Sequence, residues 1–256
     1  MLFRPCIDIH NGKVKQIVGG SLTDDGKETR ENFVSDKDAA YYAGIYREEG
    51  LKGGHIAMLN AYGTDEYELT RKEAFKALAA YPGGLQIGGG INADNARSFI
   101  DAGASHVIVT SYVFKDGRID LEALDKLERA VGSSRIVLDL SCRKKDGDYY
   151  IVTDRWQKYT KHKLEPSLFE ELSGSCDEFL VHAVDVEGKR SGIDENVISI
   201  LAGIPYTITY AGGVSTLDDI KMIRRVGEGH IDVTVGSALS LFGGSLDMGE
   251  VIKCIR

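Results

Sequence analysis

Apolar and polar positions along the chain form two alternating kinds of segment. Eight short runs are rich in β-branched and other apolar residues, which is typical of buried strands. These runs span residues 3–9, 55–59, 85–87, 106–110, 135–140, 178–182, 206–210 and 231–235. Between most of them lie longer segments whose apolar residues have helical spacing, such as Ala96, Phe99 and Ile100. A strand followed by a helix, repeated along the chain, predicts an α/β fold with a parallel sheet.

The number of strand–helix units favours a closed barrel. The run at 106–110 is apolar throughout, as expected for a strand whose two faces are both covered. The chain has 256 residues, and one (β/α)8 barrel usually has about 250. We therefore predict a single (β/α)8 TIM barrel domain over residues 1–256. An open, doubly wound sheet remains an alternative, because periodicity does not show closure.

Three features of the first half of the chain recur in the same order in the second half. The paired features are Asp8 with Asp139, Gly89-Gly90 with Gly212-Gly213, and Ser111 with Gly236-Ser237. Each member follows an apolar run, and each pair is separated by about half the chain. This order predicts a duplication into half-barrels of approximately 1–131 and 132–256, whose equivalent loops would meet at one mouth of the barrel.

The paired glycine clusters are candidate phosphate sites. A Gly-Gly turn between a strand and a helix lets the backbone approach a ligand closely, and the following helix offers unpaired N–H groups. Gly236 and Ser237 stand where barrels often bind phosphate, after the last strand. Glycines that merely permit tight turns are the alternative. Together, the two clusters predict a small-molecule substrate with two phosphates.

Asp8 and Asp139 are the candidate catalytic residues. A carboxylate at the end of an apolar strand is costly unless it is paired or faces the mouth of the barrel. Two carboxylates on one substrate can serve as acid and base if their surroundings separate their pKa values. The alternative is a structural role for each, accepting backbone N–H bonds in its loop.

The amino-acid composition argues against several classes of partner and cofactor. The chain has 31 basic and 39 acidic residues, a formal net charge of −8, which argues against nucleic acid as a partner. No apolar run reaches the ~18 residues of a membrane span, and the first residues do not resemble a signal peptide. Four widely separated cysteines favour free thiols in the cytoplasm. The six histidines lack metal-ligand spacing, so we expect no metal or cofactor, and we expect a monomer.

Five motifs together resemble the ProFAR isomerase family of histidine biosynthesis. They are Cys-Ile-Asp-Ile-His-Asn-Gly-Lys-Val at 6–14, Gln-Ile-Gly-Gly-Gly-Ile at 86–91, Leu-Asp-Leu-Ser at 138–141, Tyr-Ala-Gly-Gly at 210–213 and Val-Gly-Ser at 235–237. The segments 15–20, 139–143 and 182–188 resemble the fungal and plant branch of the family. The resemblance covers nearly the whole chain.

This resemblance implies an Amadori rearrangement of a bisphosphorylated aminoaldose to an aminoketose. It implies that Asp8 is the general base at the sugar carbon and that Asp139 protonates the ring oxygen. Trp156 resembles the family's mobile aromatic residue that covers the bound imidazole, and Arg143 is expected to contact the substrate. His182 stands where the bacterial branch usually has threonine, and it is expected to contact the substrate or to tune Asp139.

Two loops are expected to close over such a substrate. The segment 21–32 is polar and follows the first strand, and the segment 143–160 follows the fifth. Both would lie at the barrel mouth, where enclosing a long bisphosphate requires movable segments.

Three other functions share part of this pattern. The cyclase subunit of imidazole glycerol phosphate synthase shares both aspartates and both phosphate sites. However, its first strand commonly continues into an Asp-Gly-Arg-Val type of loop, whereas this chain has His-Asn-Gly-Lys-Val at 10–14. A noncatalytic barrel that binds phosphorylated metabolites would not need Asp8 and Asp139. An isomerase that also rearranges phosphoribosylanthranilate would use the same acid and base and differ in pocket shape.

Overall fold

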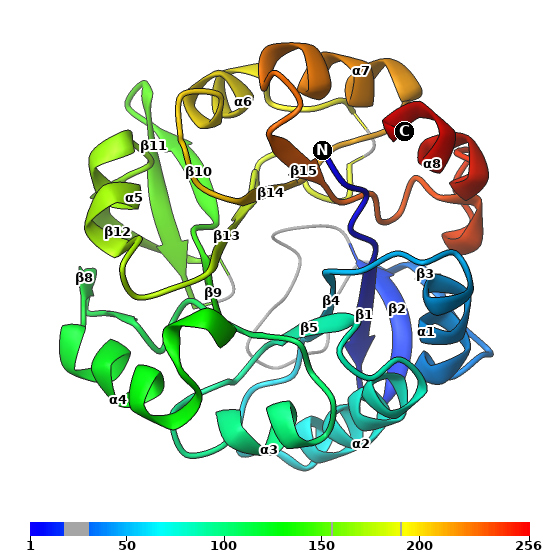
Figure 1. Cartoon of the computed structure of the whole chain (residues 1–256), viewed down its shortest axis with the longest axis horizontal. Helices are drawn as coiled ribbons and strands as arrows, with labels where there is room; N and C mark the ends of the chain where they lie inside the picture. Colours follow the sequence, from blue (N-terminus) through cyan, green and yellow to red (C-terminus); the bar gives the residue numbers. More distant parts are fainter. Residues whose placement is uncertain (18–30, 155, 190) are drawn as a thin grey trace.

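Eight parallel strands form the centre of the molecule in the computed structural model, which describes residues 1–17, 31–154, 156–189 and 191–256 (Figure 1). In sheet order they are β1 (Cys6–His10), β4 (Gly54–Met58), β5 (Leu85–Gly88), β6 (Val107–Val109), β9 (Ile136–Asp139), β13 (Glu178–His182), β14 (Ile208–Ala211) and β15 (Ile231–Val233). Every neighbouring pair in this order is parallel. The eight predicted strands are confirmed, with their ends shifted by a few residues.

The residues that precede β1 close the barrel against β15. The Arg4 amide donates to the Val233 carbonyl at 2.9 Å, and the Val233 amide donates to the Leu2 carbonyl at 3.0 Å. Phe3 and Val233 form a parallel bridge. The sheet is therefore a closed (β/α)8 barrel, and the open-sheet alternative is wrong. In this ring, β1 and β9 stand four positions apart, as do β5 and β14, and β6 and β15.

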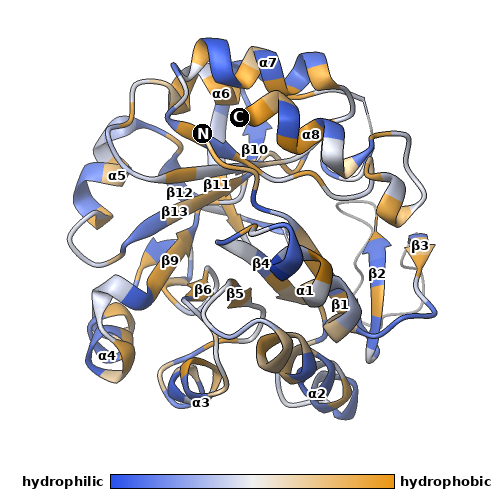
Figure 2. Ribbon diagram, turned by 45° about the vertical axis from the view of Figure 1, so that its right-hand side comes forward, coloured by the Kyte–Doolittle hydropathy of each residue, from blue (hydrophilic) through white to orange (hydrophobic). Residues whose placement is uncertain are grey.

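The helices surround the barrel (Figure 1). They are α1 (Ala39–Glu48), α2 (Asp65–Ala80), α3 (Ala96–Asp101), α4 (Leu121–Val131), α5 (Pro166–Leu172), α6 (Glu195–Leu201), α7 (Leu217–Val226) and α8 (Met248–Ile255). The predicted helical spacing is confirmed, because Ala96 and Phe99 of α3 are buried and Ile100 packs against the core. In Figure 2 the helices carry both hydrophobic and hydrophilic residues, whereas β9 and β13 are mostly hydrophobic. Within the described part of the chain, no helix combines the length and the apolar content needed to cross a bilayer.

Buried charges bind the strands together at the amino-terminal end of the barrel. Arg4 donates through Nε to Asp232 of β15 and through Nη1 to Glu178 of β13, both at 2.7 Å. Gln86 of β5 donates to the same Glu178 oxygen at 2.7 Å. All four side chains are buried, so the network satisfies charges that would otherwise be costly inside the protein.

Additional strands lie outside the central ring. They are β2 (Lys13–Ile17) and β3 (Glu31–Val34), which extend the sheet beyond β1, the pair β7 (Phe114–Lys115) and β8 (Arg118–Ile119), and the sheet β10 (Cys142–Lys145), β11 (Asp148–Thr153) and β12 (Lys158–Lys163). Short 3-10 helices occupy Ser133–Arg135 and Ser240–Phe242.

The segment 143–160 differs from the loop that the sequence led us to expect, because most of it belongs to the antiparallel sheet β10–β11–β12. Asp146 and Gly147, with φ of 52° and 93°, form the turn between β10 and β11. Two residues with positive φ are typical of a tight hairpin, and buried Tyr149 and Ile151 hold the sheet against the barrel.

Candidate functional site

One cavity of about 640 Å³ opens at the carboxyl ends of the barrel strands. It brings together almost all of the residues that the sequence singled out. The lining includes Asp8, Gly89, Gly90, Ser111, Asp139, Trp156, His182, Gly212, Gly213, Gly236 and Ser237. Residues from both halves of the chain therefore meet in one site.

Arg143 is the candidate that the structure does not bring to the cavity. It lies in β10, and its Nε donates to Asp185 at 3.0 Å. Its guanidinium group also lies 5.9 Å from the ring centre of Tyr159. A role for Arg143 in binding the substrate stays a prediction. Most of the expected 21–32 loop lies outside the described residues.

The two Gly-Gly turns have backbone conformations that suit glycine. Gly89 and Gly90 have φ of 99° and 65°, and Gly212 and Gly213 have φ of 126° and 74°. A Cβ on Gly89 would lie 2.0 Å from the Met58 carbonyl oxygen, and one on Gly213 would lie 2.1 Å from the Gly192 carbonyl oxygen. Both turns therefore need glycine, and they expose backbone to the cavity after strands that stand four positions apart.

Each glycine turn has a serine-bearing loop beside it in the ring. Ser111 follows β6, next to β5, and its hydroxyl accepts a hydrogen bond from the Asp154 amide at 3.1 Å. Gly236 and Ser237 follow β15, next to β14, and the short helix at Ser240–Phe242 comes after them. The arrangement provides two groups of backbone amides and hydroxyls, of the kind that binds phosphate.

Asp8 is a partly buried carboxyl group with few hydrogen-bond partners among the described residues. It lies on β1, and the Gln16 side-chain amide donates to its Oδ2 at 3.1 Å. Burial raises the pKa of Asp8 to about 7, with a further increase from Glu187 and a smaller decrease from His182. Asp8 can therefore both take and release a proton near neutral pH.

Asp139 has the opposite surroundings. Its Oδ1 lies 3.3 Å from His182 Nδ1 and accepts a hydrogen bond from the Ser141 hydroxyl at 2.8 Å. Burial would raise the pKa of Asp139, but the His182 charge and hydrogen bond, with bonds from Ser141 and Thr110, lower it below the usual value. Asp139 is therefore ionised under conditions in which Asp8 titrates.

Trp156 is tied to the same group of residues. Its indole N–H donates to the Ser141 hydroxyl oxygen at 3.0 Å. Its ring is 5.8 Å from the ring of His182, at an angle of 45°. Trp156 thus covers His182 and, through Ser141, helps to orient Asp139.

Three polar residues in or beside the cavity were not identified from the sequence. Gln16 and His55 are buried polar side chains on barrel strands or beside them, and Glu187 lines the cavity after β13. Burial raises the pKa of Glu187 as well. A polar residue inside an apolar strand could have pointed to Gln16 and His55, and Glu187 belongs to the segment 182–188 that carried the family resemblance.

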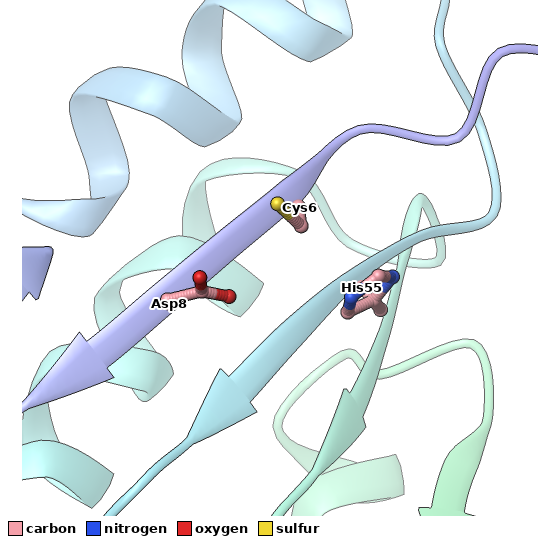
Figure 3. A group of neighbouring side chains, drawn as sticks. All are labelled: Cys6, Asp8 and His55. Carbon is pink, nitrogen blue, oxygen red and sulfur yellow. The ribbon is translucent and has the colours of Figure 1, made fainter. Parts of the chain in front are cut away.

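Cys6, Asp8 and His55 combine three types of metal ligand. Their ligand atoms lie within 4.8 Å of one another on the neighbouring strands β1 and β4 (Figure 3). Burial lowers the pKa of His55 to about 3, so its imidazole is neutral, as a metal ligand must be. However, the Gln16 amide donates to both Asp8 and Cys6, and burial raises the pKa of the Cys6 thiol. The hydrogen bonds from Gln16 and the raised pKa of the Cys6 thiol therefore favour a hydrogen-bonded cluster around Asp8 over a site that binds a cation.

The fold and this cavity define a (β/α)8-barrel protein with two carboxyl groups of opposite pKa shift in one cavity at the carboxyl mouth of the barrel. Comparison with known proteins gives the family: residues 3–246 match the family model described as "Histidine biosynthesis protein". The chain belongs to this family.

Proteins of known name are similar over almost the whole chain. A chloroplastic protein of Medicago truncatula is 56% identical over 255 residues, covering 98% of this chain and 80% of its own length. Proteins of Yarrowia lipolytica and Saccharomyces cerevisiae are 45% and 42% identical, covering 99% and 95% of this chain and 96% and 94% of their own lengths. Each is named a 1-(5-phosphoribosyl)-5-((5-phosphoribosylamino)methylideneamino) imidazole-4-carboxamide isomerase.

Proposed function

We propose that this chain catalyses the isomerisation for which these relatives are named, the conversion of a phosphoribosyl aminoaldose to the aminoketose in histidine biosynthesis. One observation carries the proposal. Asp8 and Asp139 lie on strands four positions apart in the ring, line the same cavity, and have pKa values shifted in opposite directions. This separation is what an acid–base rearrangement requires of two carboxyl groups.

The two glycine clusters supply binding for a substrate with a phosphoribosyl group at each end. Gly89, Gly90 and Ser111 bind one phosphate, and Gly212, Gly213, Gly236 and Ser237 bind the other. The clusters follow strands on opposite sides of the ring, so the sugar that reacts is held between the two aspartates. The same opposition supports the proposal that two half-barrels arose by duplication.

Asp8 acts as the base in this proposal. After the furanose opens to an iminium ion, the Asp8 carboxylate removes the proton from the adjacent sugar carbon. The C–H electron pair then forms a carbon–carbon double bond, and the iminium pair returns to nitrogen. The resulting enolamine becomes the ketose by gaining a proton at the amine-bearing carbon. The acid that opens the ring comes from the opposite side of the cavity, where Asp139 and His182 lie.

An activity assay tests the proposal. Purified protein is mixed with the aminoaldose, without ammonia, and the ketose is measured with a separate cyclase and glutaminase. We expect Asp8→Asn to lower turnover at least ~100-fold, the usual lower bound for a positioned proton-transfer group. The matched control is Asp125→Asn on the exposed face of α4, which should behave as wild type.

Two outcomes would contradict the proposal. Cyclase activity on the ketose plus ammonia, without isomerisation, would identify the related cyclase instead. Binding of the aminoaldose without any turnover would identify a metabolite-binding barrel. Turnover of phosphoribosylanthranilate in the same assay would add a second substrate.

We also propose that the protein works in the cytoplasm. The support is chemical: Cys6, Cys142, Cys176 and Cys254 are all free thiols, which suits a reducing compartment. The Medicago relative is named as chloroplastic, so localisation of a tagged full-length chain in the source organism is the test.

A further inference from the structure

His182 presents one ring nitrogen to the reaction cavity and the other to Asp139. It ends β13, and its side chain is only 15% exposed. Nδ1 faces Asp139 Oδ1 at 3.3 Å. Within the described ranges, no residue forms a hydrogen bond or an ion pair with Nε2, and His182 lines the cavity. Nε2 is therefore the nitrogen that a substrate can reach.

The surrounding hydrogen bonds fix which atoms carry hydrogen. Because the Trp156 indole N–H donates to the Ser141 oxygen, the Ser141 hydroxyl is free to direct its single hydrogen to Asp139. The Thr110 hydroxyl also bonds to Asp139. A carboxyl group that receives these donors is an acceptor, and this makes it a poor source of protons. His182 accordingly keeps its hydrogen on Nδ1, and only Nε2 gains or loses a proton.

We infer that His182 delivers, from Nε2, the proton that opens the sugar ring, and that Asp139 is a positioning residue that holds the imidazolium ring in place. This inference deepens the proposed function and rests on it. It assigns to His182 the proton transfer that the family resemblance implied for Asp139.

The charges around His182 support a protonated ring at neutral pH. Burial by itself lowers the pKa of His182. The charge and hydrogen bond of Asp139 on β9, together with the charges of Glu187 and of Asp8 on β1, outweigh this effect and raise the pKa to about 9. His55 on β4, whose ring is 5.9 Å away, is neutral and adds no opposing charge at this pH. At pH 7, Nε2 thus carries a transferable proton while a substantial fraction of Asp8 is ionised.

The proton balance of the complete reaction closes with these two residues. His182 gives its proton to the ring oxygen, the C–O bond breaks with its pair on oxygen, and the amine lone pair forms the iminium bond. Asp8 then takes the proton from the adjacent carbon. On ketonisation, the enol hydroxyl returns a proton to Nε2 of His182, and Asp8 returns its proton to the amine-bearing carbon. Both groups end in their starting states, and no co-reactant is needed.

The test compares pH profiles of His182→Asn, Asp139→Asn and wild type. We expect kcat/KM of wild type to fall above a pH of about 9, and we expect His182→Asn to lose at least ~100-fold in kcat together with this alkaline limb, with KM changed much less. His106→Asn is the matched control, because His106 pairs with Asp177 outside the cavity lining and should keep the wild-type profile.

A second measurement works on the wild-type protein and does not depend on how the variants fold. Nitrogen NMR of the histidine rings of the wild type should show His182 with both nitrogens protonated at pH 7. As a separate comparison, the pKa of His182 in Asp139→Asn should fall toward or below the ordinary value. A neutral His182 at pH 7 would overturn the inference, as would a His182→Asn variant that keeps its turnover and its alkaline limb. An inactive wild type would overturn the proposed function itself.

Discussion

At the scale of single residues, Glu187 should contribute to the acidic limit of activity. Because Glu187 is a second cause, after burial, of the raised pKa of Asp8, removing its charge makes Asp8 easier to ionise. We expect kcat/KM of wild type to fall below a pH of about 7 as Asp8 becomes protonated. In Glu187→Gln this acidic limb should move to lower pH, and the alkaline limb of His182 should move the same way.

The measurement is kcat/KM between pH 5 and 10, with Glu170→Gln on the exposed face of α5 as the control. An acidic limb that stays in place in Glu187→Gln would show that Glu187 has no electrostatic effect on Asp8.

Sequence patterns identified Asp8, Asp139 and His182 but not the difference between the two aspartates. Both follow short apolar strands with nearly the same sequence, so the pattern treats them as equivalent. Their pKa values diverge because His182, on the strand next to β9, lies beside Asp139, whereas the side-chain hydrogen bond that Asp8 receives within the described residues comes from the neutral Gln16 amide. Contacts between strands decide this difference, and residue spacing along the chain does not reveal them.

At the scale of elements, the turn after β5 should tolerate no side chain. We expect Gly89→Ala to raise KM for the bisphosphate about tenfold or more, since the new Cβ would displace the turn from the Met58 carbonyl. A strained turn of this kind also costs about 1–3 kcal/mol of stability. Steady-state kinetics measure the change in KM, and urea unfolding measures the change in the free energy of unfolding.

Gly174→Ala is the control, because a Cβ there meets no atom within 4 Å and φ is not in the left-handed region. Normal KM and normal stability in Gly89→Ala would rule out a role for this turn in holding phosphate.

The strands and helices of the barrel were predictable because each buries a continuous apolar run or one apolar face. The sheet β10–β11–β12 was not predicted, because Arg143, Lys144 and Lys145 make its first strand resemble a charged loop. The sequence signal for this sheet was the Asp-Gly turn at 146–147 followed by the aromatic and β-branched residues of β11. The positive charge of Arg143 suggested a contact with the substrate, but in the structure Arg143 pairs with Asp185 and does not line the cavity.

At the scale of the whole molecule, Arg4 should be one of the main supports of stability. Arg4→Ala would leave the carboxylates of Glu178 and Asp232 buried without their cation, which typically costs about 3–5 kcal/mol. Urea unfolding at pH 7 measures this loss. Arg129→Ala, which removes an exposed pair with Asp125 on α4, should change stability by less than about 1 kcal/mol. Equal effects of the two substitutions would contradict the role of the buried network.

Closure of the barrel could not be predicted from periodicity, since an open and a closed sheet contain the same strands. It depends on contacts between the first residues and β15, and on the buried pairing of Arg4 with Asp232, which lies 228 positions further along the chain. The number of strand–helix units and the repeated features favoured closure, but only spatial contacts show it.

The contacts of Leu2 and Arg4 with Val233 also mean that the barrel can close only late in translation. The ribosome releases the first strand early and Val233 near the end, so the edge beside Arg4 has no β15 to pair with during most of translation. Free strand edges are sites of unwanted pairing, and contacts between distant residues form slowly. The nascent chain must therefore protect this edge until the last strand emerges, and a chain that stops before Ile231 keeps the open edge and leaves Arg4 with Glu178 but without Asp232.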